Sequence, residues 1–208
     1  MADNENVFNQ HAEAYDQWFD ENAALFRSEL RALEQAVPKN QIGIEIGVGT
    51  GRFAAPLEIP YGIEPADNMA KIAEERGVTV FPGYAEDIPF PNASFDYAVM
   101  VTTVCFLTDI KQAFLEAYRI LQPQGTFIIG LIDKTSQLGR AIEGNQNEGT
   151  FYENAVLHSP EDVTEALKNA RFHSFTYWQT LTDVRGKQIE SPQQGYGEGG
   201  FVVIKAIK

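Results

Sequence analysis

The chain is poor in the side chains that cross-link proteins, ligate metals or bind polyanions. It has one cysteine, Cys105, so no internal disulfide can form, as is usual in a reducing cytoplasm. Its three histidines and one cysteine show none of the spacings typical of metal ligands, so we expect no metal site. With 16 basic and 29 acidic residues the net charge is −13, which disfavours nucleic acids and anionic membranes as partners.

Long apolar segments are also missing. No stretch approaches the roughly 20 apolar residues that a membrane-spanning helix needs. The first residues are polar and acidic, unlike a secretory signal, so we expect a cytoplasmic protein without a membrane partner. The composition, 44% hydrophobic and 22% charged over 208 residues, predicts one globular domain with a sizeable core.

Short apolar runs alternate with amphipathic segments along most of the chain. Expected strands lie at 42–47, 61–64, 78–81, 95–101, 126–132, 172–181 and 201–207. Two helices are expected within 8–36, a short one after the glycines at 47–51, and others at 66–76, at 109–121 and from Ser159 onwards. This alternation predicts an α/β fold, with a doubly wound, mostly parallel sheet and helices on both faces.

Residues 44–51 carry the most informative motif, Ile-Glu-Ile-Gly-Val-Gly-Thr-Gly. A short strand ends at an acid and three glycines, which is typical of a turn whose backbone approaches a ligand too closely to admit a Cβ. The spacing G-x-G-x-G differs from the G-x-G-x-x-G of dinucleotide-binding proteins, which disfavours a nicotinamide-dependent reductase. Taken alone, the segment is also compatible with a glycine-rich turn that binds no ligand.

A second acid stands where the next strand ends. Glu64 follows Tyr61-Gly62-Ile63, a position from which a carboxylate can accept hydrogen bonds from both ribose hydroxyls of a nucleoside. Alternatively, Glu64 is a negative charge near the N-terminus of the helix expected at 66–76. Together with the glycines, the first interpretation predicts a nucleoside across the ends of the first two strands.

In these and later motifs the chain resembles the class I S-adenosylmethionine-dependent methyltransferases, the group that includes the ubiquinone and menaquinone methylases. The matching stretches, in the order and spacing of the family, are 45–51, 62–69, 83–90, 94–96 and 117–125. The resemblance implies a Rossmann-like sheet of seven strands, with the order 3-2-1-4-5 and the last strand antiparallel between the fifth and the sixth. It also implies a helical cap at 1–38, a cofactor-binding core at 40–133 and a substrate-side segment at 134–208.

The implied cofactor is S-adenosylmethionine, with S-adenosylhomocysteine as product, bound at the carboxyl ends of the first four strands. The residues expected to bind it are Glu45, Gly47, Gly49, Gly51, Glu64, Pro65, Met69, Ala85, Glu86 and Val101. Of these, Glu45 either holds the glycine turn or reaches the ligand ammonium through water, and Met69 is as readily a core residue. Tyr84 replaces a family aspartate that meets the adenine amino group, so we expect backbone groups, Glu86 or Asp87 to recognise adenine.

The acceptor side is less defined. Candidate aromatic walls of an acceptor pocket are Tyr15, Trp18, Phe106 and Tyr152, together with Phe151 and Tyr196, although such residues are more often core. No residue stands out as a general base, because His11, His158 and His173 are more readily surface or structural residues. Cys105 is interpreted as packing, since nothing near it in the sequence would lower its pKa.

These observations predict an enzyme that transfers a methyl group by direct displacement from S-adenosylmethionine to a small-molecule acceptor. The identity of the acceptor stays open, with quinones and small amines among the options, and so does the choice between monomer and homodimer. The alternative is a catalytically silent S-adenosylmethionine-binding regulator or assembly factor with the same fold.

Overall fold

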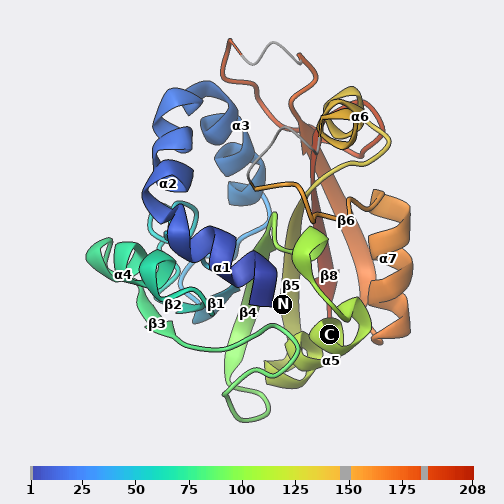
Figure 1. Cartoon of the computed structure of the whole chain (residues 1–208). Coiled ribbons are helices and arrows are strands. Elements are labelled where there is room, and N and C mark those ends of the chain that lie inside the picture. Colours follow the sequence, from blue (N-terminus) through green and yellow to red (C-terminus); the bar gives the residue numbers. More distant parts are fainter. Residues whose placement is uncertain (1, 146–150, 184–186) are drawn as a thin grey trace.

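The computed structural model describes residues 2–145, 151–183 and 187–208, and a single mixed sheet lies at its centre (Figure 1). Its strands are β1 (Gly43–Ile46), β2 (Tyr61–Ile63), β3 (Thr79–Phe81), β4 (Phe95–Val101), β5 (Leu121–Ile132), β6 (His173–Thr180), β7 (Gln193–Gln194) and β8 (Phe201–Ile207). They are arranged in the order β3-β2-β1-β4-β5-β8-β6-β7. Strands β1 to β5 pair in parallel, and β8 is antiparallel to both β5 and β6.

This topology confirms the expected order of the first five strands and the antiparallel last strand. All seven predicted strands are present, and β7 is an additional two-residue strand paired with the outer edge of β6. Strand β5 begins five residues earlier than expected, because Leu121 already pairs with Phe95 before a register shift. The turn expected around Pro123 and Gly125 is therefore an irregularity within the strand.

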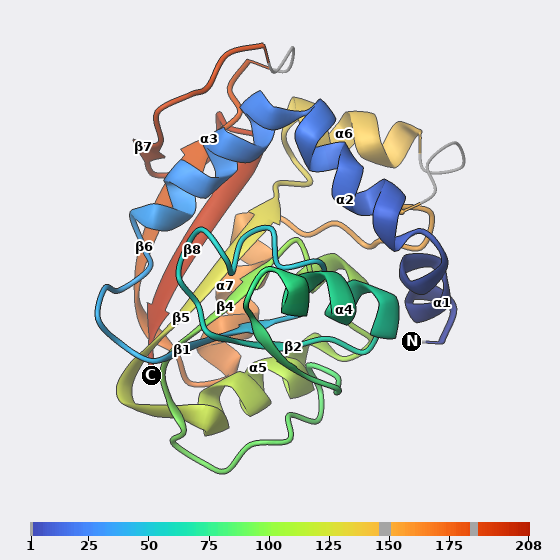
Figure 2. The same ribbon diagram turned by 90° about the vertical axis from the view of Figure 1, so that its left-hand side faces the viewer.

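Helices cover both faces of the sheet, as Figures 1 and 2 show. They are α1 (Ala2–Gln10), α2 (Ala12–Glu21), α3 (Ala23–Glu34), α4 (Asp67–Glu75), the 3-10 turn η1 (Val104–Phe106), α5 (Ile110–Ile120), α6 (Gln137–Gly144) and α7 (Pro160–Asn169). Alternate residues of β4 point to opposite layers: Met100 packs with α5 and α7, and Val101 packs with α3. Among the described residues, no helix is long and apolar enough to cross a membrane.

Three helical details differ from the sequence-based expectations. The N-terminal region forms three helices instead of two, with breaks at His11 and Asn22, where the Asn22 side chain donates to the Trp18 carbonyl. Residues 51–58 form turns instead of a short helix. Helix α6 was not expected, although Ser136 caps it by accepting a hydrogen bond from the Gly139 amide at 2.9 Å.

The remaining helices begin and end close to the predicted residues because their caps are encoded locally. Ser159 accepts from the Asp162 amide and Asp162 accepts from the Ser159 amide, which completes a capping box before Pro160. Asp109 caps α5 in the same way by accepting from the Gln112 amide. These helices hold the sheet so that the carboxyl ends of β1, β2 and β4 meet beneath α1.

Candidate functional site

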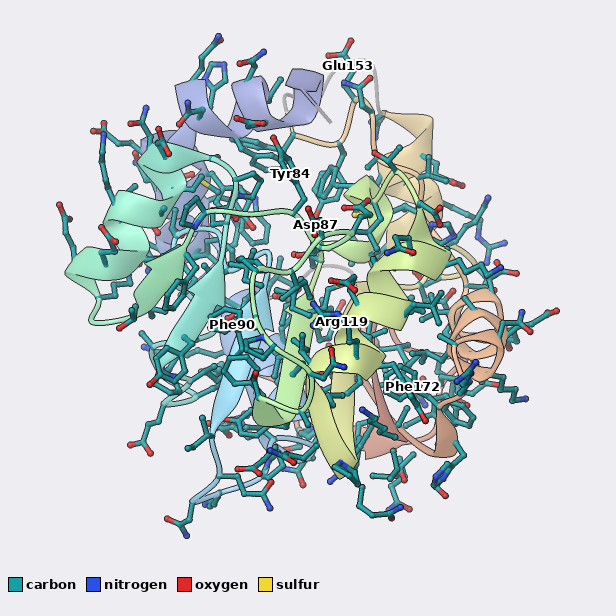
Figure 3. All side chains as sticks on the ribbon, turned by 90° about the horizontal axis from the view of Figure 1, so that it is seen from below. Tyr84, Asp87, Phe90, Arg119, Glu153 and Phe172 are labelled. Atoms are coloured by element: carbon teal, nitrogen blue, oxygen red, sulfur yellow. The ribbon has the colours of Figure 1, made fainter. Side chains whose placement is uncertain are left out.

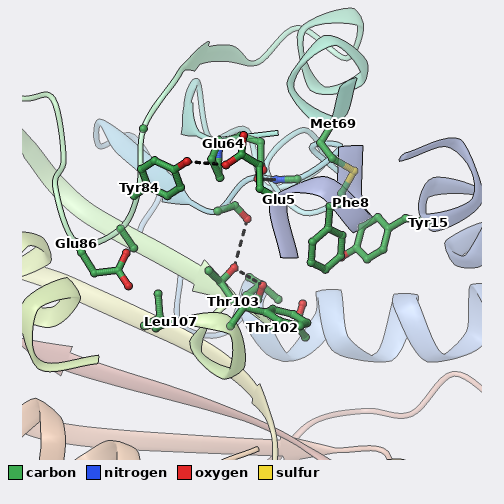
Figure 4. Close-up of a pocket in the computed structure, with 17 residues that line it drawn as sticks. Glu5, Phe8, Tyr15, Glu64, Met69, Tyr84, Glu86, Thr102, Thr103 and Leu107 are labelled. Carbon is green, nitrogen blue, oxygen red and sulfur yellow. Dashed lines mark hydrogen bonds between the residues drawn. The ribbon is translucent and has the colours of Figure 1, made fainter. Parts of the chain in front are cut away.

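A pocket lies where the carboxyl ends of β1, β2 and β4 meet the N-terminal helices (Figure 4). Its walls come from five parts of the chain: α1 and α2, the turns after β1 and β2, the first turn of α4, the 83–86 loop, and the end of β4 with the segment after it. The lining residues are Glu5, Phe8, Tyr15, Gly47, Gly49, Glu64, Pro65, Met69, Gly83, Tyr84, Ala85, Glu86, Val101, Thr102, Thr103, Phe106 and Leu107. The pocket thus brings together eight of the ten residues expected at a cofactor, all except Glu45 and Gly51.

The glycine turn divides into a pocket side and a packing side. Gly49 has a φ of +54°, and a Cβ built there would meet only Met69 and Tyr15 at ordinary contact distances of 3.5 and 3.9 Å. Its backbone therefore faces open pocket space. Gly51 has a φ of +77°, and its Cβ would lie 3.1 Å from the Cα of Ala73 in α4. The structure places Gly51 away from the pocket, and close helix packing explains its lack of a side chain.

Glu64 connects the turn after β2 to the glycine turn. Its Oε2 accepts a hydrogen bond from the Gly49 amide at 2.9 Å, and its Oε1 accepts from the Ala66 amide at 3.0 Å. The residue is 8% exposed yet lines the pocket. Burial raises the pKa of Glu64 to about 7, and the two backbone hydrogen bonds oppose this rise. The carboxyl group therefore supports the turn and lines the pocket at the same time.

Glu45 lies beneath the glycine turn and not in the pocket wall. It is 1% exposed, and its Oε2 atom has no hydrogen-bond partner among the described residues. Burial raises the pKa of Glu45 well above its ordinary value, and a hydrogen bond from the Ala54 backbone opposes the rise. The sequence left two roles open for Glu45, holding the glycine turn or reaching the ligand ammonium through water. Its buried position beneath the turn fits the first role.

The 83–90 loop forms the pocket wall on the side of β3. Tyr84 is partly exposed, and its hydroxyl donates to the Glu5 carboxylate of α1 (Figure 4). Glu86 lines the pocket, but its Oε1 accepts from the Thr108 amide at 2.9 Å and so ties the loop to the start of α5. The exposed side chain of Asp87 lies outside the pocket lining, so the expectation that it could meet adenine has no geometric support.

The far end of the same loop is held from below by α5, as the labelled Phe90 and Arg119 in Figure 3 show. Arg119 donates to the Phe90 carbonyl at 2.6 Å and to the Ile88 carbonyl at 2.9 Å. Glu116 pairs with Arg119 at 2.7 Å and accepts from the Ile88 amide. These contacts fix the loop at both ends, so the pocket wall formed by Tyr84 and Ala85 is held against the sheet.

An ion-pair cluster ties the N-terminal helices to the glycine turn. The Asp16 carboxylate of α2 lies 2.7 Å from both Arg52 and Arg76, and Arg52 also pairs with Asp20. Arg76 donates in addition to the Thr50 carbonyl in the glycine turn. Burial opposes ionisation of Asp16, but hydrogen bonds from the two arginines outweigh it and lower its pKa to about 2. By fixing Asp16, this cluster also holds the neighbouring residue Tyr15 of α2 at the pocket wall.

Aromatic rings enclose one end of the pocket. Phe8 contacts Tyr15, Phe106 and Phe151, with ring centroids 5.6, 5.1 and 5.7 Å apart. Tyr15 and Phe106 line the pocket as expected, but Phe8, Glu5, Thr102, Thr103 and Leu107 were not singled out from the sequence. Phe8 could have been found, since it belongs to the same helical apolar stripe as Tyr15.

Four of the six expected acceptor-wall residues are not among those that line the pocket, although one of them, Phe151, packs against Phe8 beside it. Trp18 is 40% exposed and is not among the described residues that line the pocket. Tyr152 packs behind Phe106, with ring centroids 6.0 Å apart, in a small cluster that includes Cys105. The ring of Tyr196 lies against that of Tyr177 of β6, with an interplanar angle of 58°. Helical spacing therefore identified the aromatic stripe of α2, but Trp18 shows that it did not identify which rings face the pocket.

The cysteine and the histidines have structural surroundings. Cys105 is buried, its thiol donates to the Thr102 carbonyl at 3.3 Å, and burial raises its pKa to about 12. Burial also lowers the pKa of the half-buried His158. His173 contacts the neighbouring Ser174 hydroxyl, and His11 is exposed beside Phe151. Within the described ranges, no group of three or more His, Cys, Asp or Glu side chains is placed to hold a metal ion.

The fold is an α/β sheet with a pocket at the carboxyl ends of its strands, and comparisons with known proteins specify the family. Residues 44–129 match the methyltransferase domain family. The crystal structure of a SAM-dependent methyltransferase, possible histamine N-methyltransferase, from Thermotoga maritima is 44% identical, with a TM-score of 0.95 over 98% of this chain and 99% of that one. An uncharacterized protein of Methanocaldococcus jannaschii is 42% identical over 98% of this chain and 99% of its own length.

A more distant similarity links the chain to quinone biosynthesis enzymes. The ubiquinone/menaquinone biosynthesis C-methyltransferase of Rickettsia bellii is 28% identical over 112 residues, which cover 45% of each chain. Because of its 44% identity to the Thermotoga maritima methyltransferase and its match to the methyltransferase domain family, the chain belongs to the class I S-adenosylmethionine-dependent methyltransferases. Enzymes of this family use S-adenosylmethionine and release S-adenosylhomocysteine.

Proposed function

We propose that this protein transfers a methyl group from S-adenosylmethionine to a small-molecule acceptor by direct displacement. The observation that carries the proposal is the continuity of the pocket. One end is a glycine turn and a buried acid suited to a nucleoside, and the other end is an aromatic enclosure suited to an organic acceptor. The net charge of −13 disfavours a nucleic acid acceptor, and the single cysteine favours a reducing cytoplasm as location.

The pocket residues fit the implied cofactor. The open space at Gly49 allows close approach of the methionine portion, and the Glu64 carboxylate can accept the ribose hydroxyls. Gly47 lines the same pocket, but its lack of a side chain makes room for Thr103, which a Cβ would approach to 2.6 Å. Pro65 and Met69 lie beside the same turn, while Ala85, Tyr84 and Glu86 form the wall proposed for adenine. Backbone groups from Val101 to Thr103 border the remaining side, which we assign to the methionine tail.

When bound, the cofactor supplies a methyl group on a sulfonium sulfur, which is a strong leaving group. The protein is therefore needed mainly for alignment and for exclusion of water, and alignment of two reactants can lower a barrier by roughly 7–11 kcal/mol. Phe8, Tyr15 and Phe106 provide an apolar surface for this purpose. The description of the Thermotoga maritima protein as a possible histamine N-methyltransferase favours an amine among the candidate acceptors.

A methyl-transfer screen with labelled S-adenosylmethionine tests the proposal. We expect transfer to at least one member of a panel of amines, phenols, thiols and quinols, together with micromolar or tighter binding of S-adenosylhomocysteine by calorimetry. The Glu64→Ala variant should lose cofactor binding, whereas the control Glu75→Ala, an exposed acid on α4, should retain it. Cofactor binding without transfer to any panel member would instead favour a catalytically silent regulator.

A further inference from the structure

Thr102 holds a backbone conformation that threonine rarely adopts. Its φ is +48°, in the left-handed region, where a β-branched side chain is a clear outlier. Eight non-glycine residues of the described chain have a positive φ, and Thr102 is the only β-branched one among them. It is also the only one of the eight that lines the pocket. Such strain persists only where the surrounding structure enforces it, and it is concentrated at functional sites.

The strain arises where the chain leaves β4. The Thr102 amide donates to the Gly130 carbonyl of β5 at 2.8 Å, and the Thr102 carbonyl accepts from the Cys105 thiol of η1 at 3.3 Å. A glycine would make the same turn and the same backbone hydrogen bonds without steric cost, because it has no Cβ. The backbone therefore does not require a threonine here, and the reason for one lies in the side chain.

The Thr102 side chain is bonded to the hydroxyl group of Tyr15. Burial raises the pKa of Tyr15 above its ordinary value, and a hydrogen bond with the Thr102 side chain opposes the rise. Both residues line the pocket (Figure 4). Their mutual hydrogen bond uses one donor and one lone pair, so oxygen lone pairs of the two hydroxyl groups remain to face a ligand.

This hydroxyl pair, Tyr15 and Thr102, borders the junction between the two ends of the pocket. A Cβ built on Gly49 would lie 3.9 Å from Cε1 of the Tyr15 ring, so the ring stands over the glycine turn. On its other side the ring contacts Phe8 of the aromatic enclosure, with ring centroids 5.6 Å apart. A methyl group that passes from the methionine portion at the turn to an acceptor in the enclosure crosses this junction.

We propose that the hydroxyl oxygens of Tyr15 and Thr102 contact the transferable methyl group of S-adenosylmethionine and fix its direction toward the acceptor. The proposal rests on the methyl transfer proposed above and adds the residues that distinguish the methyl donor from its product. The positive sulfonium polarises the C–H bonds of its methyl group, so oxygen lone pairs attract them in weak C–H···O contacts. S-adenosylhomocysteine lacks both the positive charge and the methyl group, and it gains nothing from the pair.

The environment of the pair keeps both hydroxyl groups neutral. An ionised phenol would attract the methyl group more strongly, but it would also be a nucleophile that could take the methyl group itself. The raised pKa of Tyr15 keeps its phenol protonated at neutral pH, and burial is the main cause of that rise. The pair can therefore orient the methyl group without competing with the acceptor.

Calorimetry without any acceptor tests the proposal through the ratio of the Kd for S-adenosylhomocysteine to the Kd for S-adenosylmethionine. A purely structural loss weakens both ligands alike and leaves this ratio unchanged. We expect the ratio to fall about threefold in Tyr15→Phe and in Thr102→Val, as the loss of a weak C–H···O contact implies. It should stay within about 1.5-fold of the wild-type value in Thr102→Ser, which keeps the hydroxyl group, and in the control Tyr61→Phe, which is not among the described residues that line the pocket.

A ratio that stays at the wild-type value in either Tyr15→Phe or Thr102→Val would overturn the pair, while transfer in the labelled screen would still leave the methyltransferase proposal intact. Binding of neither ligand by the wild-type protein would instead reject the proposed function. Thermal unfolding of Thr102→Gly and Thr102→Ala tests the strain itself. The glycine variant should unfold at the higher temperature because it tolerates a positive φ. An alanine variant of equal or greater stability would remove the reason for a functional side chain and overturn the proposal.

Discussion

Replacing Glu29 by glutamine removes a buried titratable group while keeping nearly the same side-chain volume. The pKa of Glu29 is raised from 4.5 to about 8 in the folded protein, whereas in the unfolded chain it keeps its ordinary value. Below pH 4.5 the carboxyl group is neutral in both states and does not affect stability. As the pH rises from 4.5 to about 8, only the unfolded state gains from ionisation, so the wild-type protein progressively loses stability.

The size of the effect follows from this interval. Each pH unit across which only the unfolded state is ionised amounts to about 1.4 kcal/mol. The wild-type protein should therefore lose up to about 5 kcal/mol relative to Glu29→Gln at pH 8 and above, and up to about 3 kcal/mol at pH 7. At pH 4.5 the free energies of unfolding of the two proteins should agree within about 1 kcal/mol.

Urea unfolding followed by circular dichroism, at several pH values from 4.5 to 8.5, measures this difference. Taking the difference between the two proteins cancels the titration of other groups with a raised pKa, such as Glu45 and Glu64. The exposed Glu34→Gln serves as control and should follow the wild-type curve. A glutamine variant that is less stable than the wild-type protein at pH 8 would refute the reasoning, because Glu29 would then have a stabilising partner.

The remaining predictions concern the cofactor side. Glu64→Gln should weaken S-adenosylhomocysteine binding at least about tenfold in calorimetry. In the wild-type protein, the affinity for S-adenosylhomocysteine should fall below pH 7, where Glu64 gains a proton. An unaltered affinity in Glu64→Gln would reject the ribose assignment of Glu64. Gly51→Ala should lower stability by about 1–3 kcal/mol in thermal unfolding, because of its positive φ and the close Ala73, with ligand affinity retained in the folded fraction. Asp16→Asn should cost about 1–2 kcal/mol at pH 7 and progressively less as the pH falls from 3.8 through about 2, because the stabilisation by Arg52 and Arg76 requires the ionised carboxylate. An equal loss at pH 7 and at pH 2 would contradict the ion-pair assignment.

The parallel half of the sheet could be predicted from the sequence because its signals are local. The run at 95–101 is apolar except for Asp96, and the structure has β4 at those same residues. The Ser159 cap fixed the start of α7 in the same way. Helix α6 was not predicted, because its apolar residues Leu138 and Ile142 form only one short stripe in a polar segment.

The candidate site was only partly accessible from the sequence for a different reason. Motif spacing places Gly49 and Glu64 at strand ends, and topology then brings such ends together. Gly51 carries the same motif but contacts α4, which only the tertiary packing shows. The burial of Glu29 gives no signal in the sequence either, because an isolated acid in an amphipathic helix looks like a surface residue until the burial of its face is known.

The ion-pair cluster at Asp16 has implications for the sequence of ligand addition. Tyr15, which lines the pocket, is covalently joined to Asp16, and Arg76 links Asp16 to the Thr50 carbonyl of the glycine turn. If cofactor binding shifts that turn, the shift would reach Tyr15 through these two short contacts. We expect a compulsory order in which the methyl donor enters first and the acceptor second. Product inhibition by S-adenosylhomocysteine should then be competitive with the donor and noncompetitive with the acceptor.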